Sequence, residues 1–242
     1  MGNTEEILWE GRIPLSSVKW TFNPNKTFNF PPKFENRRQQ IWNSMCKAYP
    51  HLYDGEILFL EDYSLEKESL KLYTRTIRFS EILVHIEDDL RVPNYGSLGF
   101  QAIITDSTHA YLLMGERAHT SEYKPGYLAI PGGIFEKNDS RKSILEACLR
   151  ELEEEIVIDV DQESFYLVAI LREASKLGIC LLVEVETMKN VSSSEGKVDG
   201  NEEWERNQLE WIKFSQICDL EQDRLMEGLN FLRSKSIEEK LS

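Results

Sequence analysis

The sequence predicts an α/β fold, because strand-like and helix-like segments follow one another through its second half. A hairpin is expected where two apolar segments, 100–104 and 111–114, flank the turn residues Asp106, Ser107 and Thr108. A helix is expected over 141–156, soon after a Pro-Gly-Gly turn at 131–133. Two further apolar segments, 165–171 and 179–185, are typical of strands that follow this helix.

The helix over 141–156 is predicted from its composition and periodicity. Neither proline nor glycine interrupts it, and either Asp139 or Ser140 would accept hydrogen bonds from the free amides at its start. Apolar residues recur at helical spacing and define one buried face, which comprises Leu145, Cys148 or Leu149, Leu152 and Ile156.

The carboxyl end of this helix carries a dense cluster of negative charge, at Glu151, Glu153, Glu154 and Glu155. The helix dipole disfavours acidic groups there, and like charges three or four residues apart repel by roughly a few tenths of a kcal/mol per pair. Glu151, Glu154 and Glu155 share one face, whereas Glu153 falls off it. Because Mg²⁺ binds oxygen ligands, this face favours a site shared by protein, metal and phosphate.

Two ordinary interpretations compete with the metal site. The glutamates can be a solvated helix face, which is the usual role of such a run, and Pro131, Gly132 and Gly133 can be a simple turn. The two features in this order and at this distance make the metal site the better prediction, because the glycines let the backbone come close to a ligand.

The segment 131–158 resembles a Nudix box, the signature of hydrolases that split pyrophosphates linked to a nucleoside or another group. Its ending, Arg150-Glu151-Leu152-Glu153-Glu154-Glu155, matches the specific part of that pattern. The chain departs from the pattern in three ways: Asp139 replaces the first glutamate, the interval from it to Arg150 is three residues longer, and Val157 replaces a glycine. None of these changes deletes a metal ligand of the pattern.

The resemblance extends over roughly residues 96–220 and implies a fold and a set of roles. The implied fold is an α/β/α sandwich with a mixed sheet, in which 209–212 forms a late strand before a final helix. The implied metal ligands are Glu151, Glu154, Glu155 and the carbonyl of Gly133, for Mg²⁺ or Mn²⁺. Arg150 is expected to pair with a glutamate and fix the helix face, with a plain structural ion pair as an equally good interpretation.

Other parts of the expected site are less closely defined by the sequence. The general base is expected to be Glu151 or a loop carboxylate among Glu202, Glu203 and Glu205, of which Glu205 is preferred. Arg117 is a candidate for phosphate binding, and Arg75 and Arg78 are candidates from the opposite side. For each of these arginines, and for Glu205, an exposed position on the surface is the alternative.

The first 95 residues are expected to form a separate α+β region, followed by the catalytic domain over 96–242 with a C-terminal helix. A helix is predicted over 37–49 and strands over 57–60 and 70–77. The stretch 41–76 weakly resembles the front part of Nudix proteins that hydrolyse UDP-sugars. A nucleotide sugar is therefore the first substrate to consider.

Composition limits the classes of partner. The formal net charge of −14 argues against nucleic acid or an anionic membrane as partner. The four cysteines form no Cys-x-x-Cys pair, so zinc and a disulfide framework are not expected. No transmembrane run or signal peptide is visible, and a cytoplasmic location is expected. The apolar front region leaves a homodimer possible.

The resulting prediction is Mg²⁺-dependent hydrolysis of a pyrophosphate bond in a nucleoside diphosphate derivative. A UDP- or ADP-sugar is the first substrate to consider. The alternative, suggested by Val157 and the longer interval, is a module that binds nucleotide derivatives without cleaving them. An isomerase of isoprenoid diphosphates on the same fold is a remote third, since no cysteine is placed for that chemistry.

Overall fold

The computed structural model describes residues 6–24, 32–50, 52–66, 69–87, 96–121, 124–156, 165–173, 178–187, 197–201 and 204–241. Its strands are β1 (Glu6–Pro14), β2 (Val18–Phe22), β3 (Glu56–Glu66), β4 (Ser69–Arg78), β5 (Ser97–Thr105), β6 (Tyr111–Glu116), β7 (Leu128–Ala129), β8 (Gly132–Ile134), β9 (Phe165–Arg172), β10 (Gly178–Glu186), β11 (Lys197–Asp199) and β12 (Gln208–Lys213).

Four α-helices accompany these strands in the described chain: α1 (Pro32–Ala48), α2 (Phe79–Glu87), α3 (Ile144–Glu155) and α4 (Glu227–Leu241). Short 3₁₀ helices connect them, namely η1 (Leu15–Ser17), η2 (Lys137–Arg141), η4 (Glu205–Asn207), η5 (Phe214–Asp219) and η6 (Gln222–Arg224). The predicted hairpin, the strands after the helix, the late strand and the C-terminal helix are confirmed. No described helix is long and apolar enough to span a membrane.

The sheet is mixed, as the resemblance implied. Its main path runs β1-β9-β10-β5-β3-β4-β2. Strand β10 lies parallel to β5 and antiparallel to β9. The turn after β5 returns the chain antiparallel into β6, where Thr105 pairs with Leu112, and β12 continues the sheet from β6.

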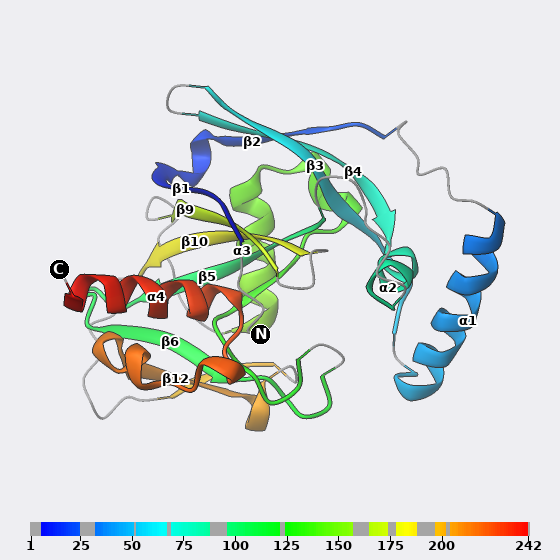
Figure 1. Ribbon diagram of the computed structural model, residues 1–242. Helices are drawn as coiled ribbons and strands as arrows, with labels where there is room; N and C mark the ends of the chain where they lie inside the picture. The colour runs from blue at the N-terminus through cyan, green and yellow to red at the C-terminus, as the bar shows by residue number, and fades with distance from the viewer. Residues whose placement is uncertain are drawn as a thin grey trace.

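Both faces of the sheet are covered by helices, because successive side chains of its central strands enter different cores. On β10, Leu181 and Val183 belong to the core that α3 covers, whereas Cys180 and Leu182 belong to the core that α4 covers. Successive side chains of a strand point to opposite faces, so a continuously apolar strand requires cover on both sides. Figure 1 shows α3 and α4 on opposite sides of β5, β9 and β10, which confirms the α/β/α sandwich.

The first 95 residues contribute strands to this same sheet. Strand β1 pairs with β9, and β3 reaches β5 through Phe59 and Ser97. Helix α1 packs on α2, where Phe34 and Ile41 meet Val84, and it lies beyond α2 at the right of Figure 1. The pairs β1–β9 and β3–β5 join strands from both sides of residue 95 in one sheet. The division into regions 1–95 and 96–242 stays a prediction.

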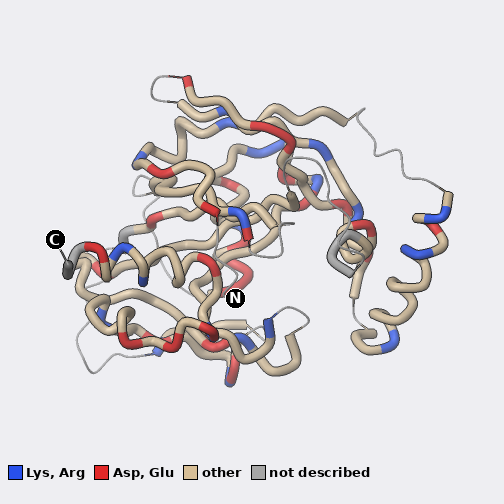
Figure 2. Tube along the Cα trace, viewed as in Figure 1, with Lys and Arg blue, Asp and Glu red and all other residues tan. Residues whose placement is uncertain are grey.

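Acidic residues recur along most elements rather than gathering at one place, whereas several basic residues lie on α1 (Figure 2). The net charge of −14 therefore arises from many separate elements of the fold.

Candidate active site

Two glycines bring the Pro-Gly-Gly turn against its neighbours. Gly132 and Gly133 form the start of β8, which pairs with β5. A Cβ atom on Gly132 would stand 2.1 Å from the carbonyl oxygen of Phe100, and one on Gly133 would stand 2.1 Å from Oε2 of Glu151. A Cβ at position 132 would push the turn away from the backbone of β5, and a Cβ at position 133 would displace the Glu151 side chain. The glycines are thus required for close approach.

Helix α3 presents its apolar face to the core and its acidic face to the turn. Ala147, Cys148 and Leu152 are buried beneath it. The helix begins later than predicted, because Ser143 is its N-cap: the Ser143 hydroxyl accepts from the Glu146 amide, and the Glu146 carboxylate accepts from the Ser143 amide. The expectation that Asp139 or Ser140 caps α3 was wrong.

Between Asp139 and α3 the chain forms the end of η2 and a short connection to Ser143. The expectation that the longer interval enlarges the loop or adds nearly a turn before the acidic end stays a prediction. Val157 lies outside the described residues.

Two of the three glutamates predicted to bind metal lie at the glycine turn. Glu155 is 5% exposed, and its Oε2 accepts a hydrogen bond of 2.8 Å from the Gly132 amide. Glu151 lies against Gly133, as the short approach to a Cβ there requires. The acidic face of α3 and the glycine turn therefore lie against each other, as the sequence suggested.

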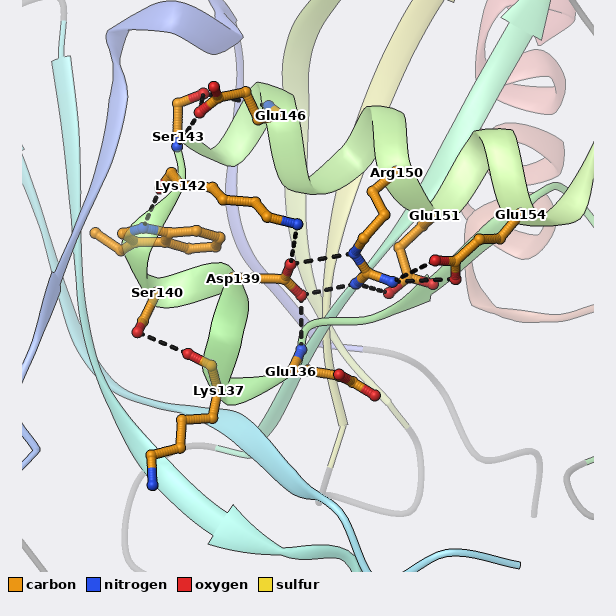
Figure 3. Close-up of polar contacts among 11 residues, drawn as sticks. Glu136, Lys137, Asp139, Ser140, Lys142, Ser143, Glu146, Arg150, Glu151 and Glu154 are labelled. Atoms are coloured by element: carbon orange, nitrogen blue, oxygen red, sulfur yellow. Dashed lines mark hydrogen bonds and ion pairs between the residues drawn. The ribbon is translucent and has the colours of Figure 1, made fainter. Parts of the chain in front are cut away.

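Arg150 lies between Asp139 and two glutamates of α3, Glu151 and Glu154 (Figure 3). Its Nη2 donates to Oδ2 of Asp139 over 2.7 Å and its Nε to Oδ1 over 3.2 Å. The same guanidinium pairs closely with Glu151 and binds both oxygens of Glu154, at 3.1 and 3.0 Å. Arg150 thus pairs with three carboxylates, and its role in fixing the helix face stays a prediction.

Asp139 is an internal anchor that does not cap α3, although its side chain belongs to the capping box of η2. It is 1% exposed. Besides Arg150 it accepts from the Glu136 amide at 2.8 Å and lies 3.4 Å from Nζ of Lys142. This full set of partners satisfies a carboxylate that burial would otherwise penalise.

Burial makes Glu151 a weaker acid than usual. Loss of solvation raises its pKa to about 7; Arg150 acts in the opposite direction, and the charges of Glu154 and Asp139 raise it further. A carboxyl group with a pKa in this range exchanges a proton near neutral pH.

The carboxylates of α3 and the backbone of the glycine turn are oxygen donors of the kind that a divalent cation binds. The donor set is carboxylate oxygen with a glycine backbone close by, which suits Mg²⁺ or Mn²⁺, and the space at Gly133 exists only because that residue lacks a Cβ. Within the described ranges, no three His, Cys, Asp or Glu side chains already converge on one point. The reason is that Glu151 and Glu154 turn to Arg150 and Glu155 turns to Gly132.

The remaining predicted ligands differ in position. The side chain of Glu154 is 58% exposed and is held through Arg150. The Gly133 carbonyl oxygen faces β5, 2.7 Å from where a Cβ on Gly99 would stand. Their part in metal binding stays a prediction.

Glu205 and Arg117 lie together, at the end of β6. The Glu205 carboxylate accepts from the His119 amide at 3.4 Å, and Arg117 forms a bridge with Trp204 and donates to the Ser121 hydroxyl at 2.8 Å. Glu202 and Glu203 lie outside the described residues.

The segment that carries Glu205 is tied to α3 through Asn201. The Asn201 amide donates to the carbonyl of Glu155 at 3.0 Å, and its side chain donates to the carbonyl of Glu154 at 3.2 Å. The loop before β12 is thereby held at the end of the acidic helix.

Arg75 and Arg78 lie on β4 and differ in environment. Arg75 is 8% exposed and pairs with Glu61 at 2.9 Å, and burial lowers its pKa. Arg78 is exposed and lies 3.7 Å from Asp54. A substrate role for either arginine stays a prediction.

A search among known proteins identifies the family. The model of the NUDIX domain matches residues 97–230, which is more than half of the chain. The chain belongs to the Nudix family. It is accordingly a Nudix-type pyrophosphohydrolase, and in coarse terms its reaction is hydrolysis of a pyrophosphate bond in a nucleoside diphosphate derivative. Nudix hydrolases generally use a divalent metal.

Solved structures of other Nudix proteins are similar at low identity. A MutT protein from Methanosarcina mazei Go1 is 13% identical, with a TM-score of 0.40 over 63% of this chain and 100% of that one. The NUDIX domain of Shewanella oneidensis NrtR, complexed with ADP ribose, is 14% identical, with a TM-score of 0.42 over 64% and 96%. The C. elegans Ap4A hydrolase is 12% identical, with a TM-score of 0.38 over 60% and 97%.

At these identities and TM-scores, the similar structures do not identify the substrate of this Nudix protein. No curated protein matches the chain.

Proposed function

We propose that this Nudix protein hydrolyses the pyrophosphate bond of a nucleotide sugar, a UDP- or ADP-sugar, with Mg²⁺ as its metal. The observation that carries the proposal is the convergence of Glu151 and Glu155 on the backbone of Gly132 and Gly133. This arrangement sets carboxylate oxygens beside the backbone of a glycine turn.

In this proposal Glu151, Glu154, Glu155 and the Gly133 carbonyl hold the metal. When bound, the metal neutralises the pyrophosphate oxygens and lowers the pKa of a water. Arg150 keeps its two bonds to Asp139 while Glu151 and Glu154 turn from it toward the site. The buried anchor at Asp139 thus keeps the guanidinium beside the carboxylates without requiring that it bind them.

Glu151 is also the first candidate for the base that takes a proton from the attacking water. Its position beside the Gly133 backbone, where the proposed metal lies, supports this role. Glu205 is the second candidate, since its loop is attached to the end of α3 through Asn201. A pH–rate profile of Glu205→Gln against Glu151→Gln separates the two.

The choice of a nucleotide sugar depends on the segment that resembles UDP-sugar hydrolases. That segment includes β3 and β4, and β3 borders the site: Ile57 bridges to Glu136, and the Leu58 amide donates to the Phe135 carbonyl at 2.7 Å. Its residues are therefore near enough to the glycine turn to influence which group is accepted.

The test is a substrate panel with product identification. Purified protein is incubated with UDP- and ADP-sugars, dinucleotides and nucleoside triphosphates, with Mg²⁺ or with chelator. Metal-dependent cleavage of the nucleotide sugars in preference to the others is expected. Glu154→Gln and Glu155→Gln should abolish it, while Glu153→Gln, an exposed change on the same helix, should not. No turnover of nucleotide sugars would contradict the proposed substrate.

Binding without cleavage is a second candidate, favoured by one observation. Arg150 already occupies Glu151 and Glu154, so a metal must displace it from both. Calorimetry that detects tight nucleotide-sugar binding, together with unchanged ligand after long incubation with Mg²⁺, would support this alternative.

A homodimer and a cytoplasmic location also remain proposals. Light scattering of the purified chain tests the first. Fractionation of the native cells tests the second.

A further inference from the structure

The connection between η2 and α3 is hydrogen-bonded to a residue in the N-terminal part of the chain. The indole Nε1 of Trp20, on β2, donates a hydrogen bond of 2.9 Å to the carbonyl of Lys142. Lys142 is the residue immediately before the Ser143 cap. A bond at this point fixes where the chain enters the acidic helix.

The side chain of the same lysine continues the connection. Its ammonium group lies 3.4 Å from Oδ1 of Asp139, the oxygen that also accepts from Nε of Arg150. The Lys142 amide donates to the carbonyl of Asp139 at 2.9 Å. Figure 3 shows Lys142 and Arg150 meeting at one oxygen of the Asp139 carboxylate, with Glu151 and Glu154 beyond Arg150.

The acid at the anchor position departs from the Nudix pattern, because Asp139 is one methylene shorter than glutamate. Lys142 lies within the lengthened interval between Asp139 and Arg150 and brings a second cation to this shorter carboxylate.

Packing alone does not account for the Trp20 contact. The Trp20 ring does pack edge-on against Phe135, with centroids 5.4 Å apart, and Phe135 stacks on Phe100. Those contacts need an aromatic ring but no N–H group. Phenylalanine at position 20 retains a ring and removes the donor, so it separates packing from the hydrogen bond.

We propose that Trp20 is a positioning residue for the metal-binding carboxylates of α3, acting through Lys142, Asp139 and Arg150. The N-terminal strand β2 thereby helps to set the geometry of a site formed by the Nudix domain. This inference rests on the proposed metal ligands, and its test measures metal binding directly.

The test is a double-mutant cycle read out by Mn²⁺ affinity, measured by electron paramagnetic resonance on the full chain. One neutral hydrogen bond contributes enough for Trp20→Phe to weaken Mn²⁺ binding by about three- to tenfold if its loss reaches the carboxylates. Lys142→Met removes the ammonium contact with Asp139 but keeps the carbonyl that accepts from Trp20, so the same substitution should have a smaller effect in that background. In an Arg141→Met background, where an exposed cation one residue away is removed, the full effect should persist.

Equal effects of Trp20→Phe in the Lys142→Met and Arg141→Met backgrounds would overturn the proposal, as would unchanged affinity in the single variant. Absence of Mn²⁺ binding to the unmodified protein would instead overturn the proposed function. The two failures are therefore distinguishable.

A second measurement needs no substitution and covers the case in which Trp20→Phe does not fold. The indole ¹⁵N–¹H resonance of Trp20 should shift during a Mg²⁺ titration, with the midpoint of metal binding. The resonance of Trp42, on α1 against Phe79, is the internal control and should not move. A Trp20 resonance that stays fixed while Mg²⁺ binds would contradict the connection.

Discussion

Replacing Glu151 by glutamine should remove a large part of the pH dependence of stability in the metal-free protein. Burial raises the folded-state pKa of Glu151 from 4.5 to about 7. Between these values the unfolded chain has lost its proton while the folded chain keeps it. Stability therefore falls as pH rises through this window, and the loss is complete above the folded pKa.

The magnitude follows from the two pKa values. A shift from 4.5 to about 7, integrated between pH 5 and pH 8 at about 1.4 kcal/mol per unit, gives a loss of about 2 to 3 kcal/mol. The side chain is only 12% exposed, so solvent screening reduces this little. Glutamine at position 151 does not titrate, and this contribution disappears.

The assay is urea unfolding in chelator at pH 5 and pH 8. The difference between the two pH values is compared for the unmodified protein and for Glu151→Gln, so that groups common to both cancel. Glu153→Gln, an exposed change, should behave as the unmodified protein does. An equal pH difference in Glu151→Gln and the unmodified protein would refute the burial of this carboxyl group.

Three further outcomes are expected from the same geometry. Asp139→Ala should lower the free energy of unfolding by about 3 kcal/mol, measured by urea unfolding, because it removes the buried carboxylate that binds both Arg150 and the Glu136 amide. Gly133→Ala should reduce kcat at least a hundredfold, by about 3 kcal/mol in transition-state free energy, since the new Cβ displaces Glu151; steady-state kinetics measures this, and a tenfold loss or less would count against it. Ser143→Ala should cost about 1 kcal/mol of stability through loss of the helix cap, with kcat nearly unchanged, which thermal unfolding and kinetics together check.

The sequence was sufficient for the elements whose pattern is local. The apolar strands over 165–171 and 179–185 lie within β9 and β10, and the hairpin at Asp106 lies between β5 and β6. The acidic face of α3 followed from residue spacing, because three- and four-residue steps place side chains together on any helix. Family membership followed from the same local cluster.

Contacts between distant segments could not be predicted in this way. Trp20 and Lys142 are 122 positions apart, and no periodicity relates them. The sequence also offered Asp139 or Ser140 as the cap of α3, since both residue types commonly have that role. In the structure Asp139 is buried beside Arg150, and Ser143 is the cap. The signal for the cap was present, as Ser143 and Glu146 form the usual capping pair.

The central claim is that Glu151, Glu154 and Glu155 hold a divalent cation at the glycine turn. The most direct measurement is anomalous diffraction from crystals grown with Mn²⁺ and a non-hydrolysable UDP-sugar analogue. The account predicts an anomalous peak bounded by carboxylate oxygens of these residues, with the diphosphate beside Gly133. A well-resolved map with the analogue bound, in which these carboxylates remain on Arg150 and Gly132 and the Mn²⁺ peak lies elsewhere, would contradict it.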